Sequence, residues 1–314
     1  MNTNNIQEVP MGLTEISQVS GIDRLTFTMM MAAIWIYSLG WIVIKIGLNE
    51  LPPITFAALR FTIAACLMIV FSTRQFSALK TFTKKDWGIF FILGFVGVFL
   101  CYVFTFTALT FTTASEGGIL INLDAIFIAV LSILFLKERS NLVLKFVGFA
   151  IALVGMILIV TGGEFTYGVL TSSRMLGDFL IIASAVCWAV FSVIGKTVTD
   201  RVEPVLVTGL SFAIGAPMLA ILSFAIEDVG LVLVASVISW SCVLYLGIAN
   251  SIATLLFFIC LKRNKEASRV SVFFLLIPIF VPILAYFIIG EIITYFTIAG
   301  AILIIFGIYF VELK

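Results

Sequence analysis

The sequence predicts an all-α membrane protein with ten transmembrane helices arranged as two inverted five-helix repeats. Hydrophobic residues make up 62% of the 314 residues and charged residues only 11%, whereas soluble domains contain about 45–50% and about 25% of these classes. The mean hydropathy is +1.24. Apolar runs of spanning length follow one another along the chain, and residues of the first half recur in order in the second half.

Ten apolar runs reach the roughly 20 residues that a helix needs to cross the hydrocarbon of a bilayer. They cover about residues 25–46, 54–73, 87–107, 115–136, 142–161, 176–197, 204–224, 238–260, 269–289 and 292–311. Glu227 and Asp228 precede a very long run, so part of residues 225–240 is expected to lie along the membrane interface.

The placement of Lys and Arg predicts the orientation. If the N-terminus is cytoplasmic, most of the 18 Lys and Arg residues lie on the cytoplasmic side. The opposite side holds only Lys45 and Arg174, and Arg60 lies within a span. By the positive-inside rule, both termini are then cytoplasmic. Residues 1–24 lack the basic start and apolar core of a cleaved signal peptide, so we expect a cytoplasmic tail on a multi-pass protein of the cell membrane.

The two halves match at a shift of 151 to 153 residues. Lys45 corresponds to Lys196, Pro53 to Pro204, and Glu138 to Glu291. Each half contains five spans, so the second half enters the membrane with the opposite orientation, as in many secondary transporters. We predict a first repeat over residues 25–161, an external linker over 162–175 and a second repeat over 176–311.

Composition also argues against several kinds of chemistry. There is no His, which excludes imidazole relays, His-metal sites and His-based triads. The five Cys lie singly in apolar runs, where we expect small apolar fillers. No nucleotide-binding motif, basic block or cluster of catalytic groups is present. We therefore expect no cofactor, no metal, no nucleic-acid partner and no enzyme activity, and the short connections disfavour a scaffold.

Residues 114–138 form the most unusual span, because it contains two acids. Asp124 is placed near the middle of the bilayer, where a carboxylate costs about 2.5–3.5 kcal/mol and usually faces a cavity or a partner. It is a candidate to bind a substrate amine or a proton; the alternative is a neutral structural acid. Glu116 lies near the external mouth. It is either a group that couples transport to protons or a hydrated interfacial carboxylate, and uniport is the alternative to proton coupling.

Three basic residues are further candidates. Lys45 and Lys196 end the first span of each half, where they either line opposite mouths or extend to the headgroups. Arg60 lies about 9 Å inside its span, so we expect it to face a mouth or to pair with Asp124 or Glu116.

Aromatic and amide residues complete the set of candidates for a central pocket. They are Tyr37, Trp41, Tyr102, Trp188, Asn122 and Asn250. Glu138 and Glu291 end spans and are expected to cap helices or to pair with nearby basic groups. Gly148, Gly155, Gly300 and Gly307 indicate close helix packing.

The sequence resembles the drug/metabolite transporter superfamily, EamA type. The matching pieces are WIYSLGWIVIK at 35–45, WAVFSVIGK at 188–196, AALRF at 57–61 and PIFVPILAYFIIGE at 278–291. The first half departs from the pattern, with Ala125 beside Asp124 where the second half has Pro278.

That resemblance implies a ten-helix transporter of small metabolites, and members of the family often move them out of the cell. We expect export of compounds such as amino acids by alternating access, from a monomer or homodimer in the lipid bilayer. The alternative is an antiporter of nucleotide sugars or phosphorylated metabolites, which requires cationic residues in the cavity.

Overall fold

The computed structural model describes residues 23–136, 142–162, 173–263, 270 and 272–312, and every regular element in this part of the chain is helical. The first half contains α2 (Arg24–Gly47), α3 (Pro53–Ser72), α4 (Lys84–Gly94), η2 (Phe95–Leu100), α5 (Cys101–Ala108), α6 (Ala114–Leu120), η3 (Ile121–Leu123), α7 (Asp124–Leu131), η4 (Ser132–Leu136) and α8 (Leu142–Thr161). The second half contains α10 (Ser173–Thr199), α11 (Pro204–Ile226), α12 (Val237–Tyr245), η6 (Leu246–Asn250), α13 (Ser251–Arg263), η7 (Val272–Leu276), α15 (Ile277–Ile289) and α16 (Tyr295–Glu312). Two short 3₁₀ helices, η1 (Thr73–Thr81) and η5 (Val229–Val234), lie in connections.

These elements join into the ten predicted transmembrane helices. Seven are long and apolar enough to cross a bilayer by length and composition, and three shorter apolar helices occupy the positions of the fifth, ninth and tenth spans. The run expected at the interface forms η5, with Leu233 and Val234 largely exposed. The predicted tail and linker fall mostly on residues 1–22 and 163–172, which lie outside the described residues, and so does Glu138.

The inverted repeat is visible in contacts that match between the halves. A Cβ atom at Gly94 would lie 2.6 Å from Ile214 and 3.1 Å from the Ser211 carbonyl oxygen. A Cβ atom at Gly247 would lie 2.8 Å from Ile63 and 3.1 Å from the carbonyl oxygen of Arg60. All three residues of the first contact are repeat mates of those in the second. The third span of each half therefore packs on the second span of the other half through a glycine.

Helix interruptions occur at equivalent places in the two halves. The third and eighth spans each contain a π-helical turn, η2 and η6, and the fourth and ninth spans each contain a 3₁₀ turn, η3 and η7. Such turns are common at functional sites because they redirect neighbouring side chains. They lie deep in apolar runs, and hydropathy alone does not predict them.

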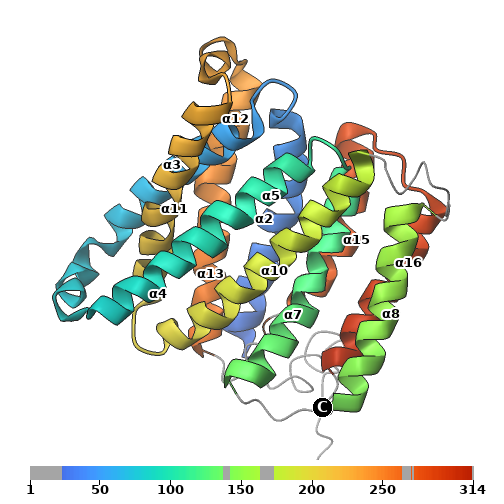
Figure 1. Cartoon of the computed structure of the whole chain (residues 1–314), viewed down its shortest axis with the longest axis horizontal. Helices are drawn as coiled ribbons and strands as arrows, with labels where there is room; N and C mark the ends of the chain where they lie inside the picture. Colours follow the sequence, from blue (N-terminus) through green and yellow to red (C-terminus); the bar gives the residue numbers. More distant parts are fainter. Residues whose placement is uncertain (1–22, 137–141, 163–172, 264–269, 271, 313–314) are drawn as a thin grey trace, which may run out of the picture.

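The fifth and tenth spans, α8 and α16, form a closely packed pair at one side of the molecule (Figure 1). A Cβ atom at Gly155 would lie 2.6 Å from the carbonyl oxygen of Gly300, and one at Gly307 would lie 2.5 Å from that of Gly148. The predicted role of these glycines in close helix packing is confirmed. In the rest of the bundle, α3 packs against α11 and α10 against α5.

Candidate functional site

A cavity of about 70 Å³ lies between spans from both halves. Its lining consists of Tyr37, Gly40, Trp41, Ile44, Cys101, Tyr102, Thr105, Ile121, Asn122, Asp124, Ser184, Trp188, Asn250, Phe274 and Ile277. Several of these residues come from the interrupted parts of the spans: Asn122 and Asp124 from η3 and the start of α7, and Asn250 from η6. The helix interruptions thus place polar side chains at the centre of an apolar bundle.

Acceptor oxygens without partners mark the cavity wall. Asn122 donates from Nδ2 to the carbonyl oxygen of Gly118 at 2.7 Å, which fixes its orientation and leaves Oδ1 as a buried acceptor. Within the described residues, Oδ1 of Asn122, Asp124 and Asn250 have no hydrogen-bond partner. A buried acceptor without a donor is costly, so these oxygens favour a ligand or waters that supply donors.

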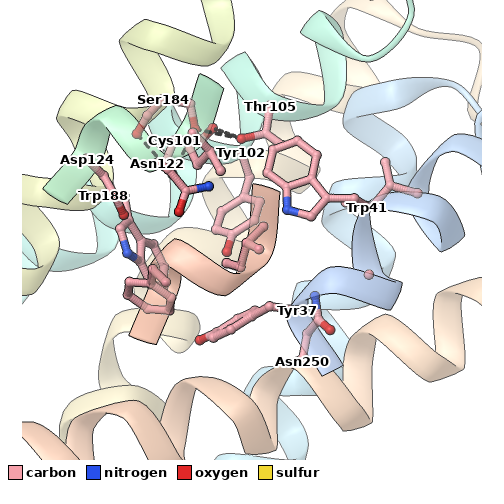
Figure 2. Close-up of a pocket in the computed structure, with 15 residues that line it drawn as sticks. Tyr37, Trp41, Cys101, Tyr102, Thr105, Asn122, Asp124, Ser184, Trp188 and Asn250 are labelled. Atoms are coloured by element: carbon pink, nitrogen blue, oxygen red, sulfur yellow. Dashed lines mark hydrogen bonds between the residues drawn. The ribbon is translucent and has the colours of Figure 1, made fainter. Parts of the chain in front are cut away.

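Aromatic rings and hydroxyl groups form the rest of the wall. Figure 2 shows the indole rings of Trp41 and Trp188 on either side of Asn122 and Tyr102. Tyr37 packs edge-on against Trp188 and donates its hydroxyl to Thr254 at 3.0 Å. Aromatic faces next to a carboxylate can hold a cationic or amine-bearing group.

Glycines make room for two of the lining side chains. A Cβ atom at Gly117 would lie 2.8 Å from the Trp41 ring, and one at Gly40 would lie 2.8 Å from the Asn250 amide nitrogen. The need for glycine at these two positions becomes apparent only once the helices are packed. Seven of the residues selected from the sequence therefore line one cavity. They are Asp124, Tyr37, Trp41, Tyr102, Asn122, Trp188 and Asn250.

Arg60 does not form the ion pair that was expected. Its guanidinium lies 4.1 Å from the ring centre of Phe61 and 4.2 Å from that of Tyr102, and among the described residues it forms no ion pair with Asp124 or Glu116. Arg60 is buried behind Tyr102, outside the cavity lining. Its charge is stabilised by aromatic faces, which depth along the helix did not indicate.

Lys45 and Lys196 each donate to backbone carbonyl groups of their own half. Lys45 donates to the carbonyl oxygens of Leu109 and Thr112, each at 2.7 Å. Lys196 donates to the carbonyl oxygen of Leu261 at 2.9 Å and to Asp200 at 3.0 Å. Leu109 follows the end of α5 and Leu261 lies near the end of α13, so both lysines satisfy carbonyl groups at the C-terminus of the third span in their own half.

Glu116 is buried and ion-paired, so the expectation of a hydrated carboxylate is wrong. It is 4% exposed and pairs with Arg174, which had been assigned to the external linker. The hydroxyl of Thr112 lies 2.8 Å from Glu116 and 2.6 Å from Asp178. Asp178 is fully buried, and sequence reasoning did not select it because it lies only five residues inside its helix.

Three carboxylates cap helix N-termini of the opposite half at one end of the molecule, which we call the capped end. Glu50 accepts from the Ser236 backbone at the start of α12 at 2.7 Å. Glu227 accepts from the backbones of Ile54 and Thr55 in α3 at 2.9 and 2.6 Å. Glu291 accepts from the backbones of Ala114 and Ser115 in α6 at 2.8 and 3.0 Å. The predicted capping role of Glu291 is confirmed, and the three contacts hold the two halves together at this end.

Among the described residues, seven bilayer-length helices and three shorter apolar ones surround a cavity with several polar side chains, an arrangement typical of a multi-pass membrane transporter. Residues 24–161 and 175–313 each match the EamA-like transporter family, so the chain belongs to that family. Membership in this family makes it a transporter of small molecules.

Several relatives share most of their length with this chain. Two uncharacterized transporters of Archaeoglobus fulgidus are 29% and 30% identical, over 93% and 88% of this chain and 99% and 95% of their own. A protein of Salmonella typhimurium named "Probable amino-acid metabolite efflux pump" is 24% identical over 87% of this chain and 90% of its own. A solved crystal structure has the same fold, with a TM-score of 0.66 and 22% identity, covering 91% of this chain and 95% of that one.

Proposed function

We propose that the protein is a secondary transporter that exports small amine-bearing metabolites, such as amino acids, across the cell membrane by alternating access. The observation that carries this proposal is the composition of the cavity wall. It combines Asp124, unpartnered acceptor oxygens and aromatic rings, and no Lys or Arg is among the described lining residues. Such a wall complements a ligand that is rich in hydrogen-bond donors and carries an amine.

In this mechanism, Asp124 binds the amine and the tryptophans flank it. Asp124 belongs to the fourth span and has no repeat mate of its own type, since Ile277 occupies the equivalent place. The acid is therefore suited to selecting the substrate, while the matched glycine contacts of the two halves serve the exchange between states. The name of the Salmonella relative supports export of amino-acid metabolites.

The alternative, an antiporter of nucleotide sugars or phosphorylated metabolites, requires cations in the cavity. Lys45 and Lys196 are occupied by helix carbonyl groups and Arg60 is behind Tyr102. None of them is positioned to bind a phosphate in the cavity, which favours the amine-bearing class.

Both termini are proposed to be cytoplasmic, as the Lys and Arg distribution predicts. The capped end, which carries the loops after the first, seventh and ninth spans, is then external. The three interhalf caps hold that end together. We also propose that the protein acts as a monomer or a homodimer.

The test begins with a comparison of metabolites retained and released by cells with and without the protein. The leading compound is then added to purified protein and to proteoliposomes. Amine-bearing compounds are expected to raise the unfolding temperature, because a ligand that binds only the folded state stabilises it, whereas sugar phosphates are expected to have no effect.

Asp124→Asn is expected to lower flux at least about tenfold, equivalent to about 1.4 kcal/mol, while the protein stays folded. The matched control is Asp228→Asn, which removes an exposed carboxylate from the cap of η5 and preserves a good capping residue. Equal flux in the two variants would show that Asp124 is a structural acid.

A further inference from the structure

Two buried carboxyl groups share one hydroxyl near the capped end. Thr112 Oγ1 lies 2.6 Å from Asp178 Oδ1 and 2.8 Å from Glu116 Oε2. A hydroxyl has a single proton and donates to only one of two acceptors. For both contacts to be hydrogen bonds, one carboxyl group must carry a proton and donate it to Thr112.

The surroundings identify the protonated acid. Glu116 is ion-paired with Arg174, whose guanidinium donates to both of its oxygens. Asp178 forms no ion pair among the described residues, is fully buried, and its Oδ2 has no hydrogen-bond partner there. An unpaired carboxylate at such a place is strongly disfavoured. Asp178 is therefore the neutral acid: it donates to Thr112, and the Thr112 hydroxyl donates to Glu116.

The chain is built to bring these groups together. A Cβ atom at Gly177 would lie 2.9 Å from the Ala108 carbonyl oxygen and 3.1 Å from the Thr112 Cβ, so glycine before Asp178 permits the close approach of α10 to the end of α5. The charged groups of the described residues around this place are Arg174 on α10 and Glu116 on α6, with Lys45 on α2 and Glu291 after α15 one contact further away.

We propose that Asp178, Thr112 and Glu116 form a proton-binding site that controls opening of the capped end. When the O–H bond of Asp178 breaks and its proton passes to water, two carboxylates face one hydroxyl and repel each other. Thr112 also holds Lys45 through its carbonyl oxygen, and Thr113 is the N-cap of α6. Loss of the proton therefore loosens the turn that positions α6 under Glu291.

The proton site stands on its own, and its use in a transport cycle rests on the proposed function. Both experiments below are carried out on purified full-length protein without substrate. Failure to find an amine-bearing substrate thus leaves their outcome unaffected, and their failure leaves the cavity assignment unaffected.

The first experiment is infrared spectroscopy of the carboxyl C=O stretch over a pH titration. The wild type is expected to show a protonated-carboxyl component at neutral pH that is missing in Asp178→Asn. Asp124→Asn is the matched control, because it removes the buried acid of the cavity and should keep the Asp178 component. If Asp178→Asn leaves the protonated-carboxyl spectrum unchanged, Asp178 holds no proton and the proposal is overturned.

The second experiment measures opening with a membrane-impermeant maleimide. Ala114→Cys, buried at the start of α6, is introduced into a chain whose five native cysteines are replaced. Labelling of this chain is expected to rise several-fold from mildly acidic to mildly alkaline pH, relative to the same chain with Asp178→Asn. The asparagine donates to Thr112 as the protonated acid does, so that chain is expected to stay closed and reports the change in thiol reactivity alone.

The Thr112→Val substitution keeps a side chain of nearly the same shape but removes the bridging hydroxyl. It is expected to give high labelling at every pH, the opposite of Asp178→Asn. If labelling rises equally with pH in the Ala114→Cys chain and in its Asp178→Asn derivative, or if Thr112→Val keeps the wild-type response, Asp178 does not control the capped end.

Discussion

At the scale of single residues, Lys45 illustrates how a cation is stabilised inside a membrane bundle without an anionic partner in direct contact. Its ammonium group donates hydrogen bonds to two backbone carbonyl oxygens just beyond the end of α5. Carbonyl groups at a helix C-terminus carry partial negative charge and have no partner within the helix. The lysine thus fixes the turn between α5 and α6, which includes Thr112.

Lys45→Met is expected to lower the free energy of unfolding by about 2 kcal/mol, because charge-assisted hydrogen bonds to helix carbonyl groups are lost. Thermal unfolding of purified protein in detergent measures the effect. Lys80→Met is the control, since Lys80 is exposed in η1 and should change little. An unfolding temperature equal to that of the control would mean that the two contacts contribute nothing.

Residue identity predicted the members of the cavity well but their contacts poorly. Trp41, Asn122, Asp124 and Trp188 are recognisable because polar or amphipathic groups at bilayer depth need a partner or a cavity. The stacking of Arg60 on Tyr102 depends on which helix faces meet, and periodicity is uninformative in helices that are apolar on all sides.

At the scale of elements, glycine contacts and carboxylate caps determine how the spans pack. Gly155 on α8 packs against the backbone of α16 with no room for a side chain, whereas no atom would lie within 4 Å of a Cβ atom at Gly88 on α4. The two glycines therefore separate the cost of close packing from the intrinsic preference of alanine for a helix.

Gly155→Ala is expected to destabilise the protein by about 1–3 kcal/mol through overpacking, with a lower unfolding temperature. Gly88→Ala should be neutral or stabilise it by up to about 1 kcal/mol, because alanine is the better helix former. If both variants shift the unfolding temperature in the same direction, the close approach of α8 and α16 is not a constraint.

The capping carboxylate Glu50 predicts a pH effect. The Ser236 backbone N–H, and then the Ser239 hydroxyl, lower the pKa of Glu50 below its usual value. A lowered pKa in the folded state means that the stabilisation is present above the ordinary Glu range and is lost as the pH falls through the lowered value. Unfolding temperatures of Glu50→Gln should therefore fall less on acidification than those of the wild type, with Asp228→Asn as the control. A wild-type slope in Glu50→Gln would remove Glu50 from the acid response.

At the scale of the whole molecule, the inverted arrangement of two five-helix halves follows from the sequence. Five spans per half, the repeat pairs Pro53/Pro204 and Gly94/Gly247, and the family match all agree. The helix interruptions and the interhalf caps could not be predicted in the same way, because they depend on the packing of one half against the other rather than on local hydropathy.

The topology predicts which positions are reached from the same side of the membrane. Cysteines at positions 80 and 262 should both react with an impermeant maleimide only from the cytoplasmic side, and a cysteine at position 49, in the turn after α2, only from the outside. Intact cells and inverted vesicles distinguish the sides. Reaction of positions 80 and 262 from opposite sides would contradict the ten-span arrangement.

The pairing of α8 with α16 also has a consequence for the order of synthesis. The helix that covers the glycines of α8 leaves the ribosome only about 130 residues after α8 itself. At ribosomal rates of about 5–20 residues per second, this delay is on the order of ten seconds. During that time α8 lacks the helix that packs on its glycines, so a nascent chain that stops before α16 presents an unpaired small-residue surface within the membrane.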